Sequence, residues 1–529
     1  MLTRADDGGD AAEHTIATRS GGDYEALPYL SLPIAYTQPA HLAALATLHG
    51  LATPAPAQAR VLELGCASGG NIIPLAARFP GARYVGIDIS QRQIADADQR
   101  SGAMGLTNIE FRRADIGELP EMHEQFDYVI CHGVYSWVPA GVQDAILRVA
   151  STCLAPEGIA AISYNVLPGW HQRTIIRDIM RHHAGRQGSP QLRVAKARAI
   201  LGQLAQSAQA SGPYGQLLRH EATVLAQKPA SYILGEFLAT DNSPCTFQEF
   251  TGKAQAHGLA YLCEADLGAS ARDLLTPQAL RTVAELSGQD AGSFEQYLDL
   301  FSGRAFRRSI LIKSSRLMAA PAAINPQRML PLHLSARLQS APVRDGDAIH
   351  AFMDARGRPL STRSPSVGRA LDRLSAAFPA TVPVRDLAGD GPERSRVARA
   401  LLDLTIQGRA TASALPLEIG QPTDVRPRVW SLARTEAAVG LPGVTSLRHV
   451  MVALPKVARA VAVQFDGSHS QAAVTQWLAK AYESGTVRMT EQDRQTGRSP
   501  GTLASITVTE VLRTLGDCAV LAPPSKQAK

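Results

Sequence analysis

The feature that most constrains the fold is a short apolar run, a loop of small residues, and a second apolar run that ends in an aspartate. The first run, VLEL at 61–64, has the length of a buried strand, and the loop GCASGG occupies 65–70. Apolar residues at helical spacing follow over 71–78, and the second run, YVGID, covers 84–88. This pattern predicts strand, glycine loop, helix and strand, which is the repeating unit of a parallel α/β sheet.

The same segment carries the groups that a nucleoside-containing ligand needs. Small residues let a ligand approach the backbone closely, and the helix after the loop offers free N–H groups at its start. Asp88 can accept hydrogen bonds from both ribose hydroxyls, and its spacing from Gly65 fits nucleotide-binding α/β units. Glu63 can meet a cationic amino group directly or through water. A glycine-rich turn that binds no ligand is the weaker interpretation.

The glycine spacing indicates which cofactor class fits. Dinucleotide sites read GxGxxG, whereas here Ala67 replaces the second glycine and the glycines stand at 65, 69 and 70. ELGCASGG followed by GIDIS resembles the cofactor motifs of class I S-adenosylmethionine-dependent methyltransferases. In this resemblance, 108–116 is the third strand and the loop beside adenine, and 126–131 and 158–164 are the fourth and fifth strands. It implies the following cofactor-binding residues: Glu63, Gly65, Cys66, Ala67, Gly69, Asn71, Asp88, Ile89, Gln93, Asp115, Ile116, His132 and Gly133.

Two segments at the carboxyl ends of these strands should face the substrate. They are HGVYSWVP at 132–139 and SYNVLPGW at 163–170, and both are rich in aromatic side chains. Enzymes that methylate nucleobase or glutamine amino groups carry an Asn/Asp-Pro-Pro-aromatic tetrad at the place that HGVYSWVP occupies here. The tetrad is absent from this chain, which argues against those acceptors. Together the two segments resemble bacterial methyltransferases with a methyltransferase regulatory domain, a group that includes rickettsial outer-membrane-protein lysine methyltransferases.

The catalytic candidates come from these two segments. The acceptor pocket is predicted to contain Tyr135, Trp137, Tyr164, Asn165 and Trp170, although each of them can instead anchor a loop or fill the core. His132 stands just after the fourth strand and can accept a proton. A structural histidine with satisfied hydrogen bonds is the interpretation that we favour for it.

The resemblance to this group extends beyond the catalytic segments. Residues 24–50 resemble a Tyr/Pro-rich lead-in that runs into a helix able to close over the cofactor. Segments 231–267 and 295–316 resemble the regulatory domain. The resemblance is strong over 24–316 and weaker to about residue 520. Where the group is expected to have a His-Glu pair, this chain has Gly235-Glu236, so no role of that histidine is carried over.

A chain of 529 residues is too long for a single core, and three or four domains are expected. The predicted fold is α/β: a Rossmann-like methyltransferase domain with a mostly parallel seven-stranded sheet, then a mainly helical region, then winged-helix-like modules. The predicted division is a mobile N-terminal tail at 1–23, a cofactor-binding methyltransferase domain at 24–184, a helical dimerisation and regulatory domain at 185–317, a middle module at 327–417 and a C-terminal module at 427–522.

A helical hairpin is predicted between residues 185 and 230, where Ala and Leu recur at helical spacing. In the group that the chain resembles, this region serves dimer formation, so a homodimer is expected. The alternative is a helix pair that packs only on its own subunit.

The two later modules each read as helix, turn, helix and short strand, and the strand-like segment of the first is TAS at 411–413. Winged helices bind DNA through basic and polar residues on a recognition helix. Arg396 and Arg399 allow this in the first module, but the corresponding helix of the second offers only Lys480. We therefore favour a protein-facing role, and nucleic acid is not expected as a partner.

Composition limits the location of the protein. With 45% hydrophobic and 19% charged residues and no apolar run of about 20 residues, the chain reads as a globular protein without a membrane span. Its start lacks the apolar stretch of a secretory signal. The six cysteines are scattered, which indicates free thiols in a reducing cytoplasm and no metal site.

The net charge is uneven along the chain. Residues 1–180 contain 12 Arg, no Lys and 19 Asp plus Glu, a net charge of −7, which leaves +13 on the remainder of a chain with a total of +6. An acidic partner for the later domains would fit this excess. Dispersed arginines on solvated faces are the interpretation that we favour.

The sequence therefore predicts an enzyme that uses S-adenosylmethionine to methylate lysine side chains of a protein. The large multidomain apparatus favours a macromolecular acceptor, but a small-molecule methyltransferase and a non-catalytic sensor of the cofactor remain alternatives. The intact loop, both carboxylates and the two aromatic segments favour catalysis over sensing.

Overall fold

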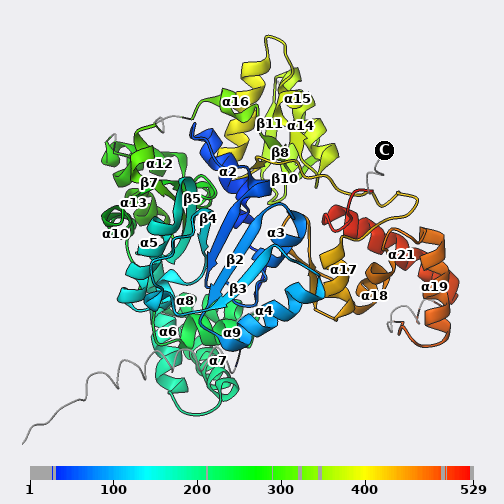
Figure 1. Ribbon diagram of the computed structural model, residues 1–529, viewed down its shortest axis with the longest axis horizontal. Helices are drawn as coiled ribbons and strands as arrows, with labels where there is room; N and C mark the ends of the chain where they lie inside the picture. The colour runs from blue at the N-terminus through cyan, green and yellow to red at the C-terminus, as the bar shows by residue number, and fades with distance from the viewer. Residues whose placement is uncertain are drawn as a thin grey trace, which may run out of the picture.

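A seven-stranded sheet lies at the centre of the molecule, with the strand order β3-β2-β1-β4-β5-β7-β6 (Figure 1). The computed structural model describes residue 27 and residues 31–209, 212–288, 290–319, 324–343, 348–489, 495 and 497–524. The tail predicted at 1–23 lies outside the described residues.

The direction of the strands agrees with the predicted fold class. Strands β1 to β5 pair in parallel, and β7 is antiparallel to both β5 and β6. In the register at the centre of the sheet, Leu62 lies opposite Val85 and Val129. The predicted mostly parallel sheet of seven strands is confirmed. Its strands are β1 Arg60–Leu64, β2 Arg83–Asp88, β3 Ile109–Arg113, β4 Phe126–Cys131, β5 Leu154–Asn165, β6 Leu259–Glu264 and β7 Phe306–Lys313.

The last two strands of the sheet come from the segment that the sequence assigned to the helical regulatory region. The predicted boundary between residues 184 and 185 therefore separates strands of one sheet. The local pattern could not show this, because the polar residues Arg307, Arg308 and Ser309 stand near the start of β7 and its pairing partner β5 is far away in the sequence.

Both faces of the sheet are covered by helices, because successive residues of the central strands are apolar and point to opposite faces. Leu62 and Leu64 of β1 share a buried cluster with residues of α5, Ala140–Cys153, and α10, Phe247–Ala256. Val61 points the other way, into a cluster with α2, Pro39–Leu48, and α3, Ile72–Arg78. The edge helix α4 covers Gln91–Ala103. This is the doubly wound arrangement that places a ligand crevice at the carboxyl ends of the parallel strands.

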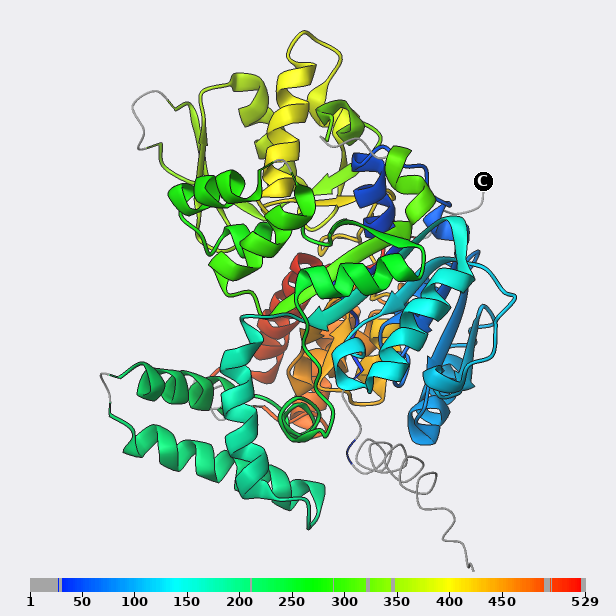
Figure 2. The same ribbon diagram turned by 90° about the vertical axis from the view of Figure 1, so that its left-hand side faces the viewer.

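The region after β5 is helical and extends away from the sheet (Figure 2). Helices α6 and α7 and η5 share a hydrophobic cluster with α8, as the alternative of a self-packed helix pair expects. The homodimer stays a prediction. The elements are α6 Trp170–Ala184, α7 Pro190–Ser207, α8 Pro213–Ala226, α9 Ala230–Ile233 and the π-helical η5 Leu234–Leu238, followed after β6 by α11 Ala269–Arg272, α12 Pro277–Ser287 and α13 Ala291–Ser302.

The middle module contains two three-stranded sheets and three helices. The strand predicted at 411–413 is present as β13. Helix α2 lies between this module and the central sheet, because His41 contacts the carbonyls of both Ala265 and Ala412. The elements are η7 Pro326–Met329, β8 His333–Ser335, β9 Leu338–Ser340, β10 His350–Asp354, β11 Pro359–Thr362, α14 Pro365–Ala377, β12 Val382–Pro383, α15 Val384–Ala388, α16 Arg394–Ile406 and β13 Thr411–Ser413.

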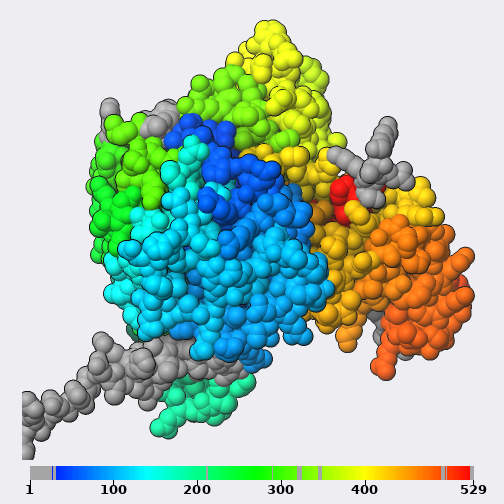
Figure 3. All heavy atoms as spheres, in the orientation of Figure 1, coloured from blue at the N-terminus to red at the C-terminus, as the bar shows by residue number. Residues whose placement is uncertain are grey.

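The C-terminal module forms a separate lobe beside α3 and α4 (Figure 3). Its core includes Ile73 of α3, so the lobe packs directly on the central domain. The sequence predicts a short strand at the end of the second helix pair, but residues 487–489 form no strand and the two-stranded sheet precedes the helix pair instead. The elements are α17 Ser431–Ala438, β14 Gly443–Thr445, β15 Met451–Ala453, α18 Lys456–Gln464, α19 Gln471–Glu483 and α21 Pro500–Asp517.

All six cysteines are free thiols. Among the residues that the structure describes, none of the helices is long and apolar enough to cross a membrane. The same residues hold no group of three or more His, Cys, Asp or Glu side chains arranged to bind a metal ion.

Candidate active site

The glycine loop turns sharply at the end of β1. The amides of Gly65 and Cys66 both donate to the carbonyl of Ile87, at 2.8 and 3.0 Å, which ties the loop to β2. Gly69 has φ +71°, and a Cβ there would lie 2.7 Å from Cζ of Phe111, so only glycine fits. Ala67 adopts φ 47°, which is uncommon for a residue with a side chain. The loop is therefore held in one unusual conformation, as expected of a functional segment.

Asp88 lies beside this loop and helps to hold it. Its Oδ2 accepts a hydrogen bond from the amide of Ala67 at 2.9 Å, and its Oδ1 accepts one from the amide of Ser90 at 2.9 Å. Because each carboxylate oxygen can accept more than one hydrogen bond, Asp88 can also receive hydroxyl groups. Ser90 caps α4 by accepting from the amide of Gln93, whose side chain is buried, while Ile89 is exposed.

The loop after β3 carries Asp115 and Ile116, the two residues predicted to lie beside adenine. Oδ1 of Asp115 accepts from the amide of Gly117 at 2.8 Å, which begins the short helix η3, Ile116–Glu118. Ile116 is buried under this turn. At the end of β4, the amide of Gly133 donates to Oγ of Ser163 at 2.9 Å, which joins β4 to β5.

Glu63 and Asn71 form a buried pair under the glycine loop. Nδ2 of Asn71 donates to Oε1 of Glu63 at 2.7 Å. The other carboxylate oxygen, Oε2, is buried and has no hydrogen-bond partner among the described residues. Burial, which is the main cause, and the charge of Asp88 raise the pKa of Glu63 to about 8. A buried acceptor without a partner is costly, so this oxygen fits a cationic amino group from a ligand.

The lead-in segment packs against the glycine loop and the first residue after it. The amide of Gly70 donates to Oγ of Ser31 at 2.7 Å, and the amide of Ile34 donates to Oδ1 of Asn71 at 2.9 Å. The part of the lead-in that contacts the loop is therefore the segment at 31–37, whereas α2, which follows it, lies against the middle module.

The predicted acceptor residues divide into two groups. The rings of Tyr135 and Tyr164 are buried with Phe250, on which Tyr164 stacks with 3.9 Å between centroids. This packing gives both tyrosines an anchoring role. The ring of Trp137 contacts Trp170 edge to face at 5.7 Å, and the buried Nδ2 of Asn165 and Nε1 of Trp170 have no hydrogen-bond partner in the described part of the chain.

Sequence reasoning missed a cluster around His132. The hydroxyl of Tyr36 lies 2.8 Å from Nδ1 of His132, and the ring of Phe306 meets the His132 ring edge to face at 5.9 Å. The guanidinium of Arg308 lies over the Tyr36 ring at 5.5 Å. Tyr36 lay within the lead-in that the sequence singled out, but Phe306 and Arg308 reach this place only because β7 pairs with β5.

The protonation of this cluster follows from its burial. Burial, aided by the charge of Arg308, lowers the pKa of His132 to about 4, and burial raises the pKa of Tyr36 above its usual range. Tyr36 is therefore a neutral phenol and His132 a neutral imidazole, and the tautomer of His132 decides which of the two donates the hydrogen bond between them. Such an imidazole is a poor proton acceptor, which supports the structural role favoured for His132.

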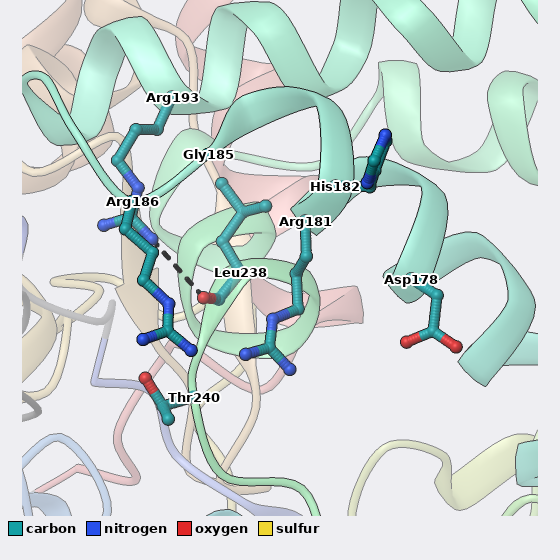
Figure 4. A pocket seen from close by; sticks show the side chains of 8 residues that line it. All are labelled: Asp178, Arg181, His182, Gly185, Arg186, Arg193, Leu238 and Thr240. Atoms are coloured by element: carbon teal, nitrogen blue, oxygen red, sulfur yellow. Dashed lines mark hydrogen bonds between the residues drawn. The ribbon is translucent and has the colours of Figure 1, made fainter.

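A basic pocket lies between the end of α6, the start of α7 and the segment after η5 (Figure 4). None of its residues belongs to the predicted cofactor or acceptor set. Arg193 donates to the carbonyl of Leu238, and Arg181 and His182 stand in the last turn of α6, where cations stabilise the helix dipole. The positions of Arg181, His182 and Arg193 therefore have a structural explanation. The lining residues are Asp178, Arg181, His182, Gly185, Arg186, Arg193, Leu238 and Thr240.

Comparison with protein families gives three matches in order along the chain. Residues 56–208 match a methyltransferase domain, residues 229–313 match a predicted methyltransferase regulatory domain, and residues 426–520 match the C-terminal winged helix domain of PKMT. The first two matches overlap the central sheet, and the third coincides with the C-terminal lobe.

Individual relatives support the same picture. An uncharacterized protein of Rickettsia prowazekii, RP789, is 39% identical over 289 residues, which is 54% of this chain and 52% of that protein. A second one, RP028, is 35% identical over 233 residues, which is 44% of this chain and 93% of that protein. The chain thus spans about half the length of the first relative and nearly all of the second.

One solved structure matches almost the whole chain. PKMT2 from Rickettsia typhi, in complex with AdoHcy, superposes with a TM-score of 0.81 and 24% sequence identity, covering 93% of this chain and 100% of that one. At this identity the match shows a shared fold, including the arrangement of the later modules around the central sheet.

Proposed function

Because this chain belongs to the family of class I methyltransferases with a methyltransferase regulatory domain, we propose that it methylates the ε-amine of lysine side chains in a protein. The chain is an enzyme that uses S-adenosylmethionine, and the proposed part is the acceptor. The observation that carries it is the domain order, in which the methyltransferase and regulatory domains are followed by a winged helix of the PKMT type.

The cofactor site that we propose consists of the loop and the strand ends around it. Asp88 would receive the ribose hydroxyls, Asp115 and Ile116 the adenine, and the free oxygen of Glu63 the amino group. The remaining contacts would come from the loop, the start of α4 and the end of β4: Gly65, Cys66, Ala67, Gly69, Asn71, Ile89, Gln93, His132 and Gly133.

When bound, the cofactor supplies an electrophilic methyl group on a sulfonium. The transfer needs little covalent help, so the chain contributes mainly by aligning the acceptor and excluding water. The rings of Tyr36, His132 and Phe306 meet at the ends of β4 and β7 and offer faces and edges that suit a developing cation. A lysine ε-amine must arrive neutral, and a desolvated pocket lowers its pKa.

Among the residues predicted from the sequence, we keep Trp137, Asn165 and Trp170 as acceptor-side candidates. Asn165 ends β5 next to Phe306, and its buried Nδ2 is available to a substrate carbonyl. Tyr135 and Tyr164 would act by fixing these strand ends. His132 would act as a ring and a hydrogen-bond acceptor, since its lowered pKa argues against a role as a base.

The other two readings make different predictions. A small-molecule methyltransferase would use the same cofactor site with a metabolite as acceptor, and a sensor would bind the cofactor without transferring its methyl group. To separate the three, the purified protein is incubated with methyl-labelled S-adenosylmethionine and a lysate divided into protein, nucleic-acid and small-molecule fractions. We expect acid-stable label on lysine in the protein fraction. Label in the small-molecule fraction alone would reject the proposal, and binding without transfer would favour the sensor.

Cofactor binding should release a proton from Glu63. With a pKa of about 8, this carboxyl is mostly protonated at neutral pH, and a cationic amino group beside it favours the carboxylate. The affinity for S-adenosylhomocysteine should therefore rise by roughly tenfold per pH unit between about pH 6 and 7.5. Calorimetry in buffers of different ionisation enthalpy measures the proton. Glu63→Gln should remove both the proton release and the slope, and an unchanged slope in this variant would contradict the assignment.

We further propose that the protein is a cytoplasmic homodimer whose interface includes the α7–α8 hairpin. Leu192 and Tyr214 are exposed on this hairpin, and a dimer would bury them. A monomer mass at all concentrations in light scattering would reject the dimer.

Nucleic acid is not a proposed partner, because Arg396 pairs with Glu393 at 2.6 Å and α19 offers only Lys480 as a basic residue. Salt-sensitive retention on immobilised DNA would contradict this.

A further inference from the structure

A loop of the C-terminal module reaches the glycine loop of the central domain. Arg78, in the last turn of α3, donates to the carbonyl of Leu447 at 2.8 Å. Two residues later, Nε2 of His449 lies 2.8 Å from Oδ1 of Asn71, the residue that starts α3. His449 is only 3% exposed and adopts φ +62°, a strained conformation for a residue with a side chain.

A second contact joins the same lobe to the loop. Arg100 of α4 donates to the carbonyl of Ser68 at 2.8 Å and lies 3.8 Å from the buried carboxylate of Glu436, which belongs to α17. The C-terminal module thus contacts α3 and its first residue Asn71 directly, and it reaches the glycine loop through Arg100 of α4.

The hydrogen bonds of Asn71 fix the orientation of its amide. The backbone amide of Ile34 can only donate, so the atom that it meets at 2.9 Å must be the oxygen, Oδ1. His449 must then donate from Nε2 to the same oxygen. Nδ2 of Asn71 faces Oε1 of Glu63 at 2.7 Å and Oγ1 of Thr37 at 3.0 Å.

His449 is suited to this single task. Burial, reinforced by the charge of Arg78, lowers its pKa to about 3, so the ring is neutral at any physiological pH. A neutral imidazole carries one N–H, and the geometry assigns it to Nε2. Without this donor, the backbone amide of Ile34 is left to hold Oδ1, and the amide group of Asn71 that faces the carboxyl of Glu63 is held less firmly.

We propose that His449 of the C-terminal module is a positioning residue of the cofactor site, which fixes Asn71 and thereby holds the free oxygen of Glu63 for the cofactor's amino group. The proposal rests on the cofactor site described above and not on the identity of the acceptor. It makes the C-terminal lobe a structural part of that site, in addition to any role in substrate binding.

The test is a titration of S-adenosylhomocysteine into the full-length protein. His449→Phe keeps a ring but removes the donor, and it should weaken binding by about tenfold. His449→Gln places an amide N–H near the same point and should restore affinity to within about threefold of the wild type. In a Glu63→Gln background, the effect of His449→Phe should fall below about twofold, because Asn71 then orients no carboxylate.

A matched control separates the hydrogen bond from docking of the lobe. Arg448 stands next to His449 but contacts Ser335 and the carbonyl of Pro379 in the middle module. Arg448→Met should leave the affinity within about twofold. Equal weakening in Arg448→Met, or in the Glu63→Gln background, would overturn the proposal, as would unchanged binding by folded His449→Phe.

If His449→Phe does not fold, Asn71→Asp serves as the second variant. It is isosteric and keeps an acceptor for His449 while removing the donor to Glu63, and it should weaken binding by at least as much as predicted for His449→Phe. Unchanged affinity would overturn the proposal. A wild type that binds S-adenosylhomocysteine but transfers no methyl group to lysine would refute the proposed acceptor and leave this inference standing.

Discussion

Replacing Asp88 with alanine is expected to weaken the binding of S-adenosylhomocysteine by about 100-fold or more. The carboxylate holds the amides of Ala67 and Ser90 at 2.9 Å each and is the proposed acceptor for the ribose hydroxyls. Hydrogen bonds to a charged group contribute about 1.5–3 kcal/mol each, so the loss of two ligand contacts accounts for this factor. Isothermal titration calorimetry at constant pH measures the affinity directly.

Two further variants calibrate this result. Asp88→Asn keeps one oxygen that can accept from Ala67 and should retain part of the affinity. Asp115→Ala removes one acceptor on the adenine side and is expected to cost about tenfold. If Asp88→Ala binds as tightly as the wild type while its circular dichroism spectrum is unchanged, the ligand does not lie along the end of β2.

The second large effect concerns stability. Arg307 is fully buried and pairs with Asp299 at 2.7 Å, Glu264 at 2.9 Å and Glu295 at 3.0 Å. Arg307→Ala would leave these three carboxyl groups with Arg304, which lies 3.4–4.0 Å from them, as their remaining cation. Removing one partner of a buried ion pair costs about 3–5 kcal/mol. We therefore expect a clear fall in the midpoint of thermal unfolding of the unit that contains β6 and β7.

Arg83 provides the matched control for this prediction. It also pairs with two carboxylates, Glu110 at 3.2 Å and Glu124 at 3.1 Å, but its side chain is 51% exposed. Surface pairs of this kind contribute about 0–1 kcal/mol, so Arg83→Ala should barely change the midpoint. An equal shift in the two variants would show that the buried cluster does not hold β6 and β7 in the sheet.

The sequence predicted the part of the site that depends on local patterns. The strand, loop and helix at 60–78 and the aspartate at the end of β2 follow from runs of apolar and small residues, and the structure has them with nearly the same bounds. The fold class could be predicted for the same reason, since the central parallel strands β1, β2, β4 and β5 are mostly apolar and buried.

The residues that the sequence missed are those brought in by distant pairing. Phe306 reaches His132 because β7 inserts beside β5, and His449 reaches Asn71 because the C-terminal lobe packs on α3. Neither contact leaves a local signal. Tyr135 and Tyr164 show the converse case, in which a local signal pointed to a role that distant packing changes. Their position near the strand ends suggested an acceptor site, but their rings pack with Phe250 because α10 covers that end of the sheet.

The central claim, transfer to lysine of a protein, is tested most directly with one unfolded carrier protein prepared in two forms. In the first its lysines are free, and in the second they are blocked by acetylation, with all other side chains unchanged. Each form is incubated with the enzyme and S-adenosylmethionine, and the modified residues are identified by mass spectrometry. We expect methylated lysine in the first form and no methylation in the second. Equal methylation of the two forms, or none in either while a small-molecule fraction is modified, would contradict the claim.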